Sequence, residues 1–135
     1  MHIIVCLDDR GGMSFFGRRQ SMDRALREKA VALAGGGRLW MSPYSAGQFS
    51  DHPEHIIADE AFLSKAPENA WCFAELENIE ACADRIQQIA VFHWNRLYPS
   101  DRRFPEELLK GRKLLCREDF AGYSHEQITL EVFDL

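Results

Sequence analysis

Two stretches near the C-terminus, IAVFHW at residues 89–94 and ITLEVFDL at residues 128–135, decide the fold class of this chain. The first is a strong strand candidate, because it is a short run of mainly apolar, β-branched and aromatic residues. The second alternates apolar and polar side chains, which is typical of a half-buried antiparallel strand. With a further strand expected over residues 113–116, they predict an antiparallel pair at the C-terminal edge of a sheet.

The N-terminal half supplies the remaining strands of that sheet. Residues 2–7 form an apolar run that stops at two acids, which fits a strand buried on both faces of a parallel or mixed sheet. After a glycine-containing loop over residues 10–20, Ser21 is the expected N-cap of a helix over about residues 22–34. The glycines at 35–37 are interpreted as the end of that helix. Further strands are expected at 39–41, 54–58 and 70–74, a helix at 77–85, and helical turns at 44–49 and 105–109.

This order of elements predicts an α/β protein with a mixed, mostly parallel central sheet, helices on its faces and an antiparallel C-terminal edge. A chain of 135 residues fits one domain, 1–135. The composition, 46% hydrophobic and 27% charged, is that of a soluble globular protein, and no apolar run approaches the ~20 residues that span a bilayer. The N-terminus lacks the features of a signal peptide, so a cytoplasmic location without membrane contact is expected.

The net charge and the cysteine spacing argue against some classes of partner and of metal or redox site. The net charge of -5 argues against a nucleic-acid partner, and the basic pairs at residues 18–19 and 102–103 are interpreted as solvated faces. The four cysteines are scattered and form no CxxC pair, so neither a zinc ribbon nor a thioredoxin motif is supported. Because Cys6, Cys72 and Cys116 lie in apolar runs, we expect them to be reduced and buried.

Three strings resemble the dihydrofolate reductase family in the right order: IIVCLDDRGGM at 3–13, IAVFHWNRLYPSDRRFPEE at 89–107, and RKLLCREDF with ITLEVFDL at 112–120 and 128–135. The resemblance spans nearly the whole chain, with a shortened middle. It implies the three-layer fold of that family, with the mixed sheet and antiparallel edge already expected. The positions that match the family's motifs are Asp8, Gly12, Gly17, His93, Asp101, Phe104 and Pro105.

The same resemblance shows departures at the positions that carry the family's chemistry. The folate-binding carboxylate falls on Leu26, and a leucine cannot support proton transfer. The family's Met-Gly-Arg motif, which opens a helix toward the cofactor phosphates, reads MSP at residues 41–43 and has lost its basic residue. The hydroxyl-bearing position before His93 is Phe92. Folate reduction is therefore not expected of this chain.

The family's glycine pair, which lets the backbone approach the dinucleotide pyrophosphate, falls on Ala74 and Glu75. A carboxylate there would face phosphate charge, and like charges at ~4 Å repel by ~4 kcal/mol per pair at an effective dielectric constant near 20. NADPH in its usual pose is disfavoured, and no cofactor is predicted.

A second resemblance concerns the N-terminal stretch, which is similar to small bacterial proteins that carry the label ribonuclease Z. The metal-binding motif of that nuclease, H-x-H-x-D-H, is absent, because none of the five histidines forms an HxH pair. Dinuclear hydrolysis needs several such ligands that converge. A nuclease activity rests on the label alone, and no metal site is predicted.

Residues at strand ends and in the first long loop are the candidate ligand-binding residues. Asp8 and Asp9 close a buried strand at its carboxyl end, where ligands of open α/β sheets bind. Because adjacent strand residues point to opposite faces, at most one of them faces a cleft, and a structural turn acid is the alternative. His93 matches a family position and is expected to be a hydrogen-bonded histidine of the core or the cleft.

Three further candidates, Arg18, Arg19 and Asp23, lie in or after the loop that borders the substrate cleft of the reductases. The guanidinium groups of Arg18 and Arg19 could bind an anionic ligand, and a solvated loop is the alternative. Phe15-Phe16, in a glycine-flanked loop, is a candidate contact for a partner subunit, which leaves a homo-oligomer open.

These observations lead to two main hypotheses. The first is a dihydrofolate reductase-like domain without folate reductase activity that binds a small ligand or a partner protein. The alternative is an NAD(P)H- or nucleotide-using reductase with a re-tooled cleft, in which Arg18, Arg19 and Asp23 take new roles.

Overall fold

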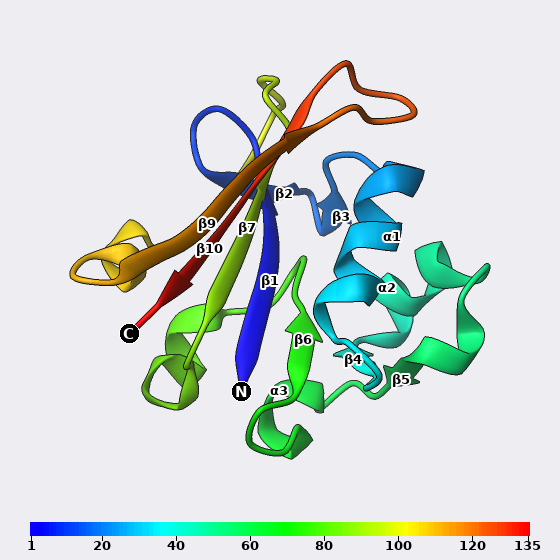
Figure 1. The fold of residues 1–135 in the computed structure, drawn as a ribbon, viewed down its shortest axis with the longest axis vertical. Helices are drawn as coiled ribbons and strands as arrows, with labels where there is room; N and C mark the ends of the chain where they lie inside the picture. Colours follow the sequence, from blue (N-terminus) through cyan, green and yellow to red (C-terminus); the bar gives the residue numbers. More distant parts are fainter.

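The computed structural model describes all residues, 1–135, and contains a central sheet of seven strands in the order β5-β4-β6-β1-β7-β10-β9 (Figure 1). β1 lies in the middle and its residues Ile3, Ile4 and Val5 have no exposed surface, as expected of a strand covered on both faces. The strands of this sheet are β1 (His2–Leu7), β4 (Leu39–Met41), β5 (Ile56–Ala58), β6 (Trp71–Phe73), β7 (Ile89–His93), β9 (Lys113–Phe120) and β10 (Ile128–Asp134).

The pairing confirms the mixed sheet and its antiparallel C-terminal edge. β1 pairs in parallel with β6 and β7, and β4 pairs in parallel with β5 and β6. β10 lies between β7 and β9 and runs antiparallel to both. Because the five strands from β5 to β7 are parallel, their carboxyl ends meet at one edge, and the loops that follow them gather there.

Helical segments cover both faces, which confirms the three-layer arrangement. On one face α1 (Arg24–Leu33) buries Leu26 and Ala30 against alternate residues of β1, β7 and β10, such as Phe92. On the other face Phe62 of α3 (Phe62–Lys65) and Ile79 of a 3₁₀ segment pack against the opposite side of β1 and β7. The remaining helical segments are α2 (Pro43–Ala46), η1 (Gly47–Phe49), η2 (Pro53–His55), η3 (Ile79–Arg85) and η4 (Glu106–Leu109).

A second, three-stranded sheet stands where the sequence predicted a loop. β2 (Gly12–Phe15) pairs with β3 (Arg18–Arg19) and with β8 (Arg102–Arg103) in the order β3-β2-β8. The turn of the β2–β3 hairpin has positive φ at Phe16 (52°) and at Gly17 (67°), as a tight hairpin requires. The two basic pairs, distant in sequence, are therefore on the two outer strands of one small sheet.

Three local predictions need correction. The N-cap of α1 is Asp23 and not Ser21, because the Asp23 side chain accepts a hydrogen bond from the amide of Ala25. The predicted helix over residues 77–85 is the 3₁₀ segment η3. Cys116 is exposed and not buried, because it lies on the edge strand β9, which nothing covers.

None of the helices has both the length and the apolar character that a membrane span requires.

The core on the α1 side predicts the effect of a truncation in β7. Phe92 is fully buried and meets Phe120 edge-on at 6.2 Å between ring centroids. Phe92→Ala should lower the free energy of unfolding by about 3–5 kcal/mol through lost burial and a cavity. The matched control Phe16→Ala, at a side chain that is 78% exposed, should change it far less. Urea denaturation measures both, and equal changes would contradict the assignment of the core.

Candidate functional site

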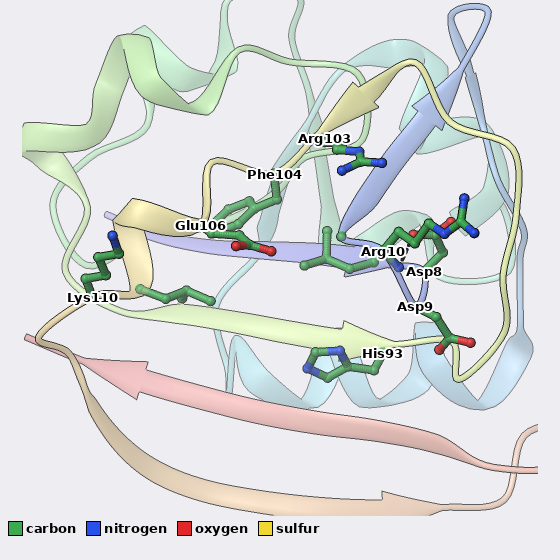
Figure 2. Close-up of a pocket in the computed structure, with 11 residues that line it drawn as sticks. Asp8, Asp9, Arg10, His93, Arg103, Phe104, Glu106 and Lys110 are labelled. Carbon is green, nitrogen blue, oxygen red and sulfur yellow. Dashed lines mark hydrogen bonds between the residues drawn. The ribbon is translucent and has the colours of Figure 1, made fainter.

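The carboxyl ends of β1 and β7 border a pocket with a volume of about 740 Å³. Figure 2 shows the imidazole of His93 and the carboxylate of Glu106 on opposite sides of the opening, with Asp9 at one end and Lys110 at the other. The lining residues are Leu7, Asp8, Asp9, Arg10, Gly11, His93, Arg103, Phe104, Glu106, Leu109 and Lys110.

Asp8 and Asp9 have different surroundings at this edge. Asp8 is 3% exposed, and its Oδ1 accepts hydrogen bonds from the amides of Arg10 (2.9 Å) and Gly12 (2.7 Å). Its Oδ2 accepts from the amide of Tyr98 at 3.1 Å, so Asp8 fixes two loops to each other. Asp9 is exposed and lines the pocket. Asp8 therefore has the contacts of a structural turn acid, and Asp9 is the acid available to a ligand.

His93 faces the pocket from the end of β7 and is paired with an acid of the next strand. Its Nε2 lies 2.7 Å from Oε1 of Glu131 on β10. In the antiparallel register Glu131 lies opposite Val91, two residues before His93 and on the same face of the sheet. A carboxylate that holds one ring nitrogen fixes the orientation of the imidazole.

The exposed charged side chains of this pocket have no partner within the chain. Arg10, Arg103 and Lys110 supply three positive charges, Asp9 and Glu106 supply two negative ones, and none of the five forms a salt bridge. Such unpaired groups suit a small polar ligand with at least one anionic group. No group of three or more His, Cys, Asp or Glu side chains has the geometry of a metal site.

A second cluster lies after β6 and centres on a buried carboxylate. Glu75 is 6% exposed, and its Oε1 accepts a hydrogen bond from Oγ of Ser45 in α2 at 2.8 Å. Nε of Arg19 on β3 lies 3.2 Å from Oε1 and 3.1 Å from Oε2 of the same carboxylate. The Arg19 guanidinium also donates to the carbonyl of Tyr44 (3.1 Å) and lies 4.3 Å from the centre of its ring. Both oxygens of the Glu75 carboxylate therefore have partners within the chain.

A third cluster joins the start of α1 to the loop between β9 and β10. Oδ1 of Asp23 accepts hydrogen bonds from the amides of Ala25 (2.9 Å) and Tyr123 (3.2 Å). Its Oδ2 accepts from the amide of Ser124 at 2.9 Å and lies 3.0 Å from Nδ1 of His125. A Cβ added to Gly122 would lie 2.6 Å from Oδ2, so the loop closes on Asp23 only with a glycine there.

The hydrogen bonds decide the ionisation of Asp23. Burial favours the neutral acid, but the hydrogen bonds from His125, Ser124, Tyr123 and Ala25 outweigh it and hold the pKa of this carboxyl well below its usual range. Asp23 is therefore a carboxylate in the folded protein at neutral pH.

The structure brings only some of the sequence candidates together. Asp8, Asp9 and His93 line one pocket, whereas Arg18 lies beside another, and Arg19 and Asp23 are engaged in the second and third clusters. Sequence reasoning missed Glu131 and His125. The alternation of residues 128–133 and the antiparallel pairing with β7 could have placed Glu131 next to His93. No local pattern marks His125, which lies in a loop.

Comparisons with known proteins support the fold through structure alone. No family model matches the chain, and no curated protein is similar to it in sequence. A solved structure of dihydrofolate reductase from Enterococcus faecalis, complexed with NADP(H) and RAB-propyl, matches with a TM-score of 0.68. The match covers 98% of this chain and 94% of that chain at 8% identity. The chain has the dihydrofolate reductase fold. At this identity the likeness concerns the fold only, and the ribonuclease Z label has no support.

The residues that depart from the reductase motifs lie in the core, at the start of α2 and directly after β6. Leu26, on the buried side of α1, is 2% exposed. Residues 42–43 form the start of α2, with Ser42 as its N-cap. Ala74 and Glu75 directly follow β6, the parallel neighbour of β1. Ala74 packs in the core, and Glu75 turns toward Arg19 and Ser45.

The buried ion pair leads to a stability prediction. Arg19→Met would leave the Glu75 carboxylate buried without its cation, and we expect a loss of about 3 kcal/mol in the free energy of unfolding. Arg19→Met combined with Glu75→Gln should recover much of that loss, because the uncompensated charge is gone. Arg24→Met, at a solvent-exposed pair with Glu28, is the control and should cost under about 1 kcal/mol. Urea denaturation of the wild type and the three variants tests this, and similar losses for both arginines would contradict it.

The low pKa of Asp23 leads to a pH prediction. A carboxyl whose pKa is lower in the folded than in the unfolded state stabilises the fold above its unfolded pKa, near ~4. That stability is lost as the pH falls further. The free energy of unfolding of the wild type should therefore fall more steeply from pH 5 to pH 3 than that of Asp23→Asn. Urea titrations at several pH values measure the two slopes, and parallel slopes would show that Asp23 has no special contribution.

Proposed function

We propose that this chain is a dihydrofolate reductase-like domain that does not reduce folate and instead binds a small anionic molecule in the pocket at the carboxyl ends of β1 and β7. The proposal includes a cytoplasmic setting, in which the glutathione pool would keep the four free cysteines as thiols.

The observation that carries the proposal is the Glu75 carboxylate in the space beside β6. In the family, a glycine pair at this point leaves room for the pyrophosphate of the cofactor. Here Glu75, Arg19 and Ser45 satisfy one another in the same region, with Oγ of Ser45 at 2.8 Å from Oε1 and Nε of Arg19 at 3.1 Å from Oε2. A dinucleotide would have to displace a buried ion pair and then face its carboxylate.

The chain also lacks the acidic residue that folate reduction requires. The position of the folate-binding carboxylate is Leu26, whose side chain is buried against the sheet. The nearest acid in sequence, Asp23, accepts hydrogen bonds from three backbone amides and contacts His125. It is therefore committed to the loop between β9 and β10 and does not replace the missing group.

The same contacts weigh against the re-tooled reductase. That hypothesis uses Arg18, Arg19 and Asp23, and two of these three side chains are held by internal partners. Only Arg18 is exposed and free of salt bridges. The open pocket at β1 and β7 remains the better candidate for a ligand, because its charged groups are unpaired.

A thermal-shift experiment tests the proposed function. We expect no rise in melting temperature with NADPH or folate, and a rise of several degrees with millimolar citrate or inorganic phosphate. The rise should be lost in Arg103→Ala, which removes a cation of the pocket, and kept in Lys113→Ala, an exposed cation on β9. A rise of several degrees with NADPH would overturn the proposal, and so would an anion effect that is the same in both variants.

A further inference from the structure

The third cluster contains a hydroxyl, an imidazole and a carboxylate in a row. Nε2 of His125 lies 3.1 Å from Oγ of Ser21, and its Nδ1 lies 3.0 Å from Oδ2 of Asp23. Because the Asp23 carboxylate can only accept, Nδ1 carries a proton, and in the neutral imidazole Nε2 is then an acceptor within reach of the hydroxyls of Ser21 and Tyr98. This is the arrangement by which proteins activate a serine as a nucleophile.

The acid and the imidazole of this row are more buried than the serine, as a serine nucleophile requires. Asp23 and His125 are 2% and 4% exposed, whereas Ser21 is only half-buried. The ring of Trp94 stacks on His125 with 4.6 Å between ring centroids and 26° between planes, which fixes the orientation of the imidazole. The base and its orienting acid are therefore shielded from water, and the hydroxyl lies at the boundary with solvent.

We propose that Ser21 is the nucleophile of an ester-hydrolysing site in which His125 is the general base and Asp23 is a positioning residue. Oγ of Ser21 forms a bond to the carbonyl carbon of the ester while its proton passes to Nε2 of His125. The C–O bond to the alcohol then breaks, and the alcohol leaves with that proton. Water attacks the acyl-serine in the same way, which releases the carboxylic acid and returns the proton to Ser21.

Backbone donors for the negative charge of the intermediate stand next to the nucleophile. The amides of Ser21 and Met22 lie outside the strands and helices and donate no hydrogen bond within the chain. Amide groups that are free and close to the attacked carbonyl are the kind of donor that stabilises an oxyanion.

A pocket lined by Gln20, the residue before Ser21, indicates the class of ester. It has a volume of about 520 Å³, and Gln20 and Tyr98 of its wall adjoin the row, since the Tyr98 hydroxyl lies 3.0 Å from Nε2 of His125. Its other walls combine the aromatic pair Phe15-Phe16 with Arg18, whose guanidinium has no salt bridge. These walls suit an ester with an apolar or aromatic acyl group and an anionic substituent. The site is separate from the pocket at β1 and β7, so this inference does not depend on the proposed function.

Covalent labelling of the full-length chain tests the inference. A fluorophosphonate probe should label the wild type at Ser21, as located by peptide mass spectrometry, and the chain should hydrolyse p-nitrophenyl butyrate. Ser21→Ala should lose the labelling and at least 10-fold of the hydrolysis, whereas Ser50→Ala, at an exposed serine away from the cluster, should retain both.

Asp23→Asn separates a catalytic arrangement from a structural one. If Asp23 orients His125, this variant should label at least 10-fold more slowly at pH 7 even at a temperature where circular dichroism shows it fully folded. Absence of labelling in the wild type, equal labelling of Ser21→Ala, or an unchanged rate in folded Asp23→Asn would each overturn the proposal.

Discussion

The burial of β1 on both faces, between two parallel neighbours, is the constraint on which the rest of the structure depends. Ile3, Ile4 and Val5 have no exposed surface, and the strand pairs with β6 on one side and β7 on the other. Parallel pairing sends all three carboxyl ends to one edge. Asp8, Glu75 and His93 are each within two residues of such an end, so this one pairing pattern delivers all three polar groups to the same rim.

The buried carboxylate of Glu75 constrains the structure of that rim. Glu75 is buried, and an unpaired buried charge would cost several kcal/mol, so its neighbours have to compensate it. Arg19 does so from the β2–β3 hairpin and Ser45 does so from α2. The compensation links the small sheet to α2, with the Arg19 guanidinium above the Tyr44 ring. The buried Glu75 carboxylate thus gives the first long loop a fixed position.

The sequence predicted those parts of the molecule that depend on local pattern. Strand positions, the parallel core and the antiparallel edge followed from apolar runs and alternation, and the resemblance to the reductases agrees with the structural match. The sequence wrongly predicted that Cys116 would be buried. The apolar run around Cys116 pairs with a neighbouring strand on one side only and has no covering layer. The N-cap moved from Ser21 to Asp23 because contacts from the distant β9–β10 loop hold Asp23 in place.

The site residues were harder to predict, because their partners are far away in sequence. Arg19 and Glu75 are 56 positions apart, and Asp23 and His125 are 102 apart. No periodicity relates such residues, so only the folded topology could pair them. His93 and Glu131 are the exception, since the register of two regular antiparallel strands brings them together.

The Asp23–His125 cluster has a structural role, but that role does not account for all of its contacts. Asp23 holds the β9–β10 loop through the amides of Tyr123 and Ser124. A buried histidine also needs a partner for its second nitrogen, and the Tyr98 hydroxyl at 3.0 Å from Nε2 supplies one. Ser21, at 3.1 Å from the same nitrogen and partly open to solvent, is then a second hydroxyl that loop closure does not require. A role of Ser21 as an activated nucleophile would explain this additional contact with His125.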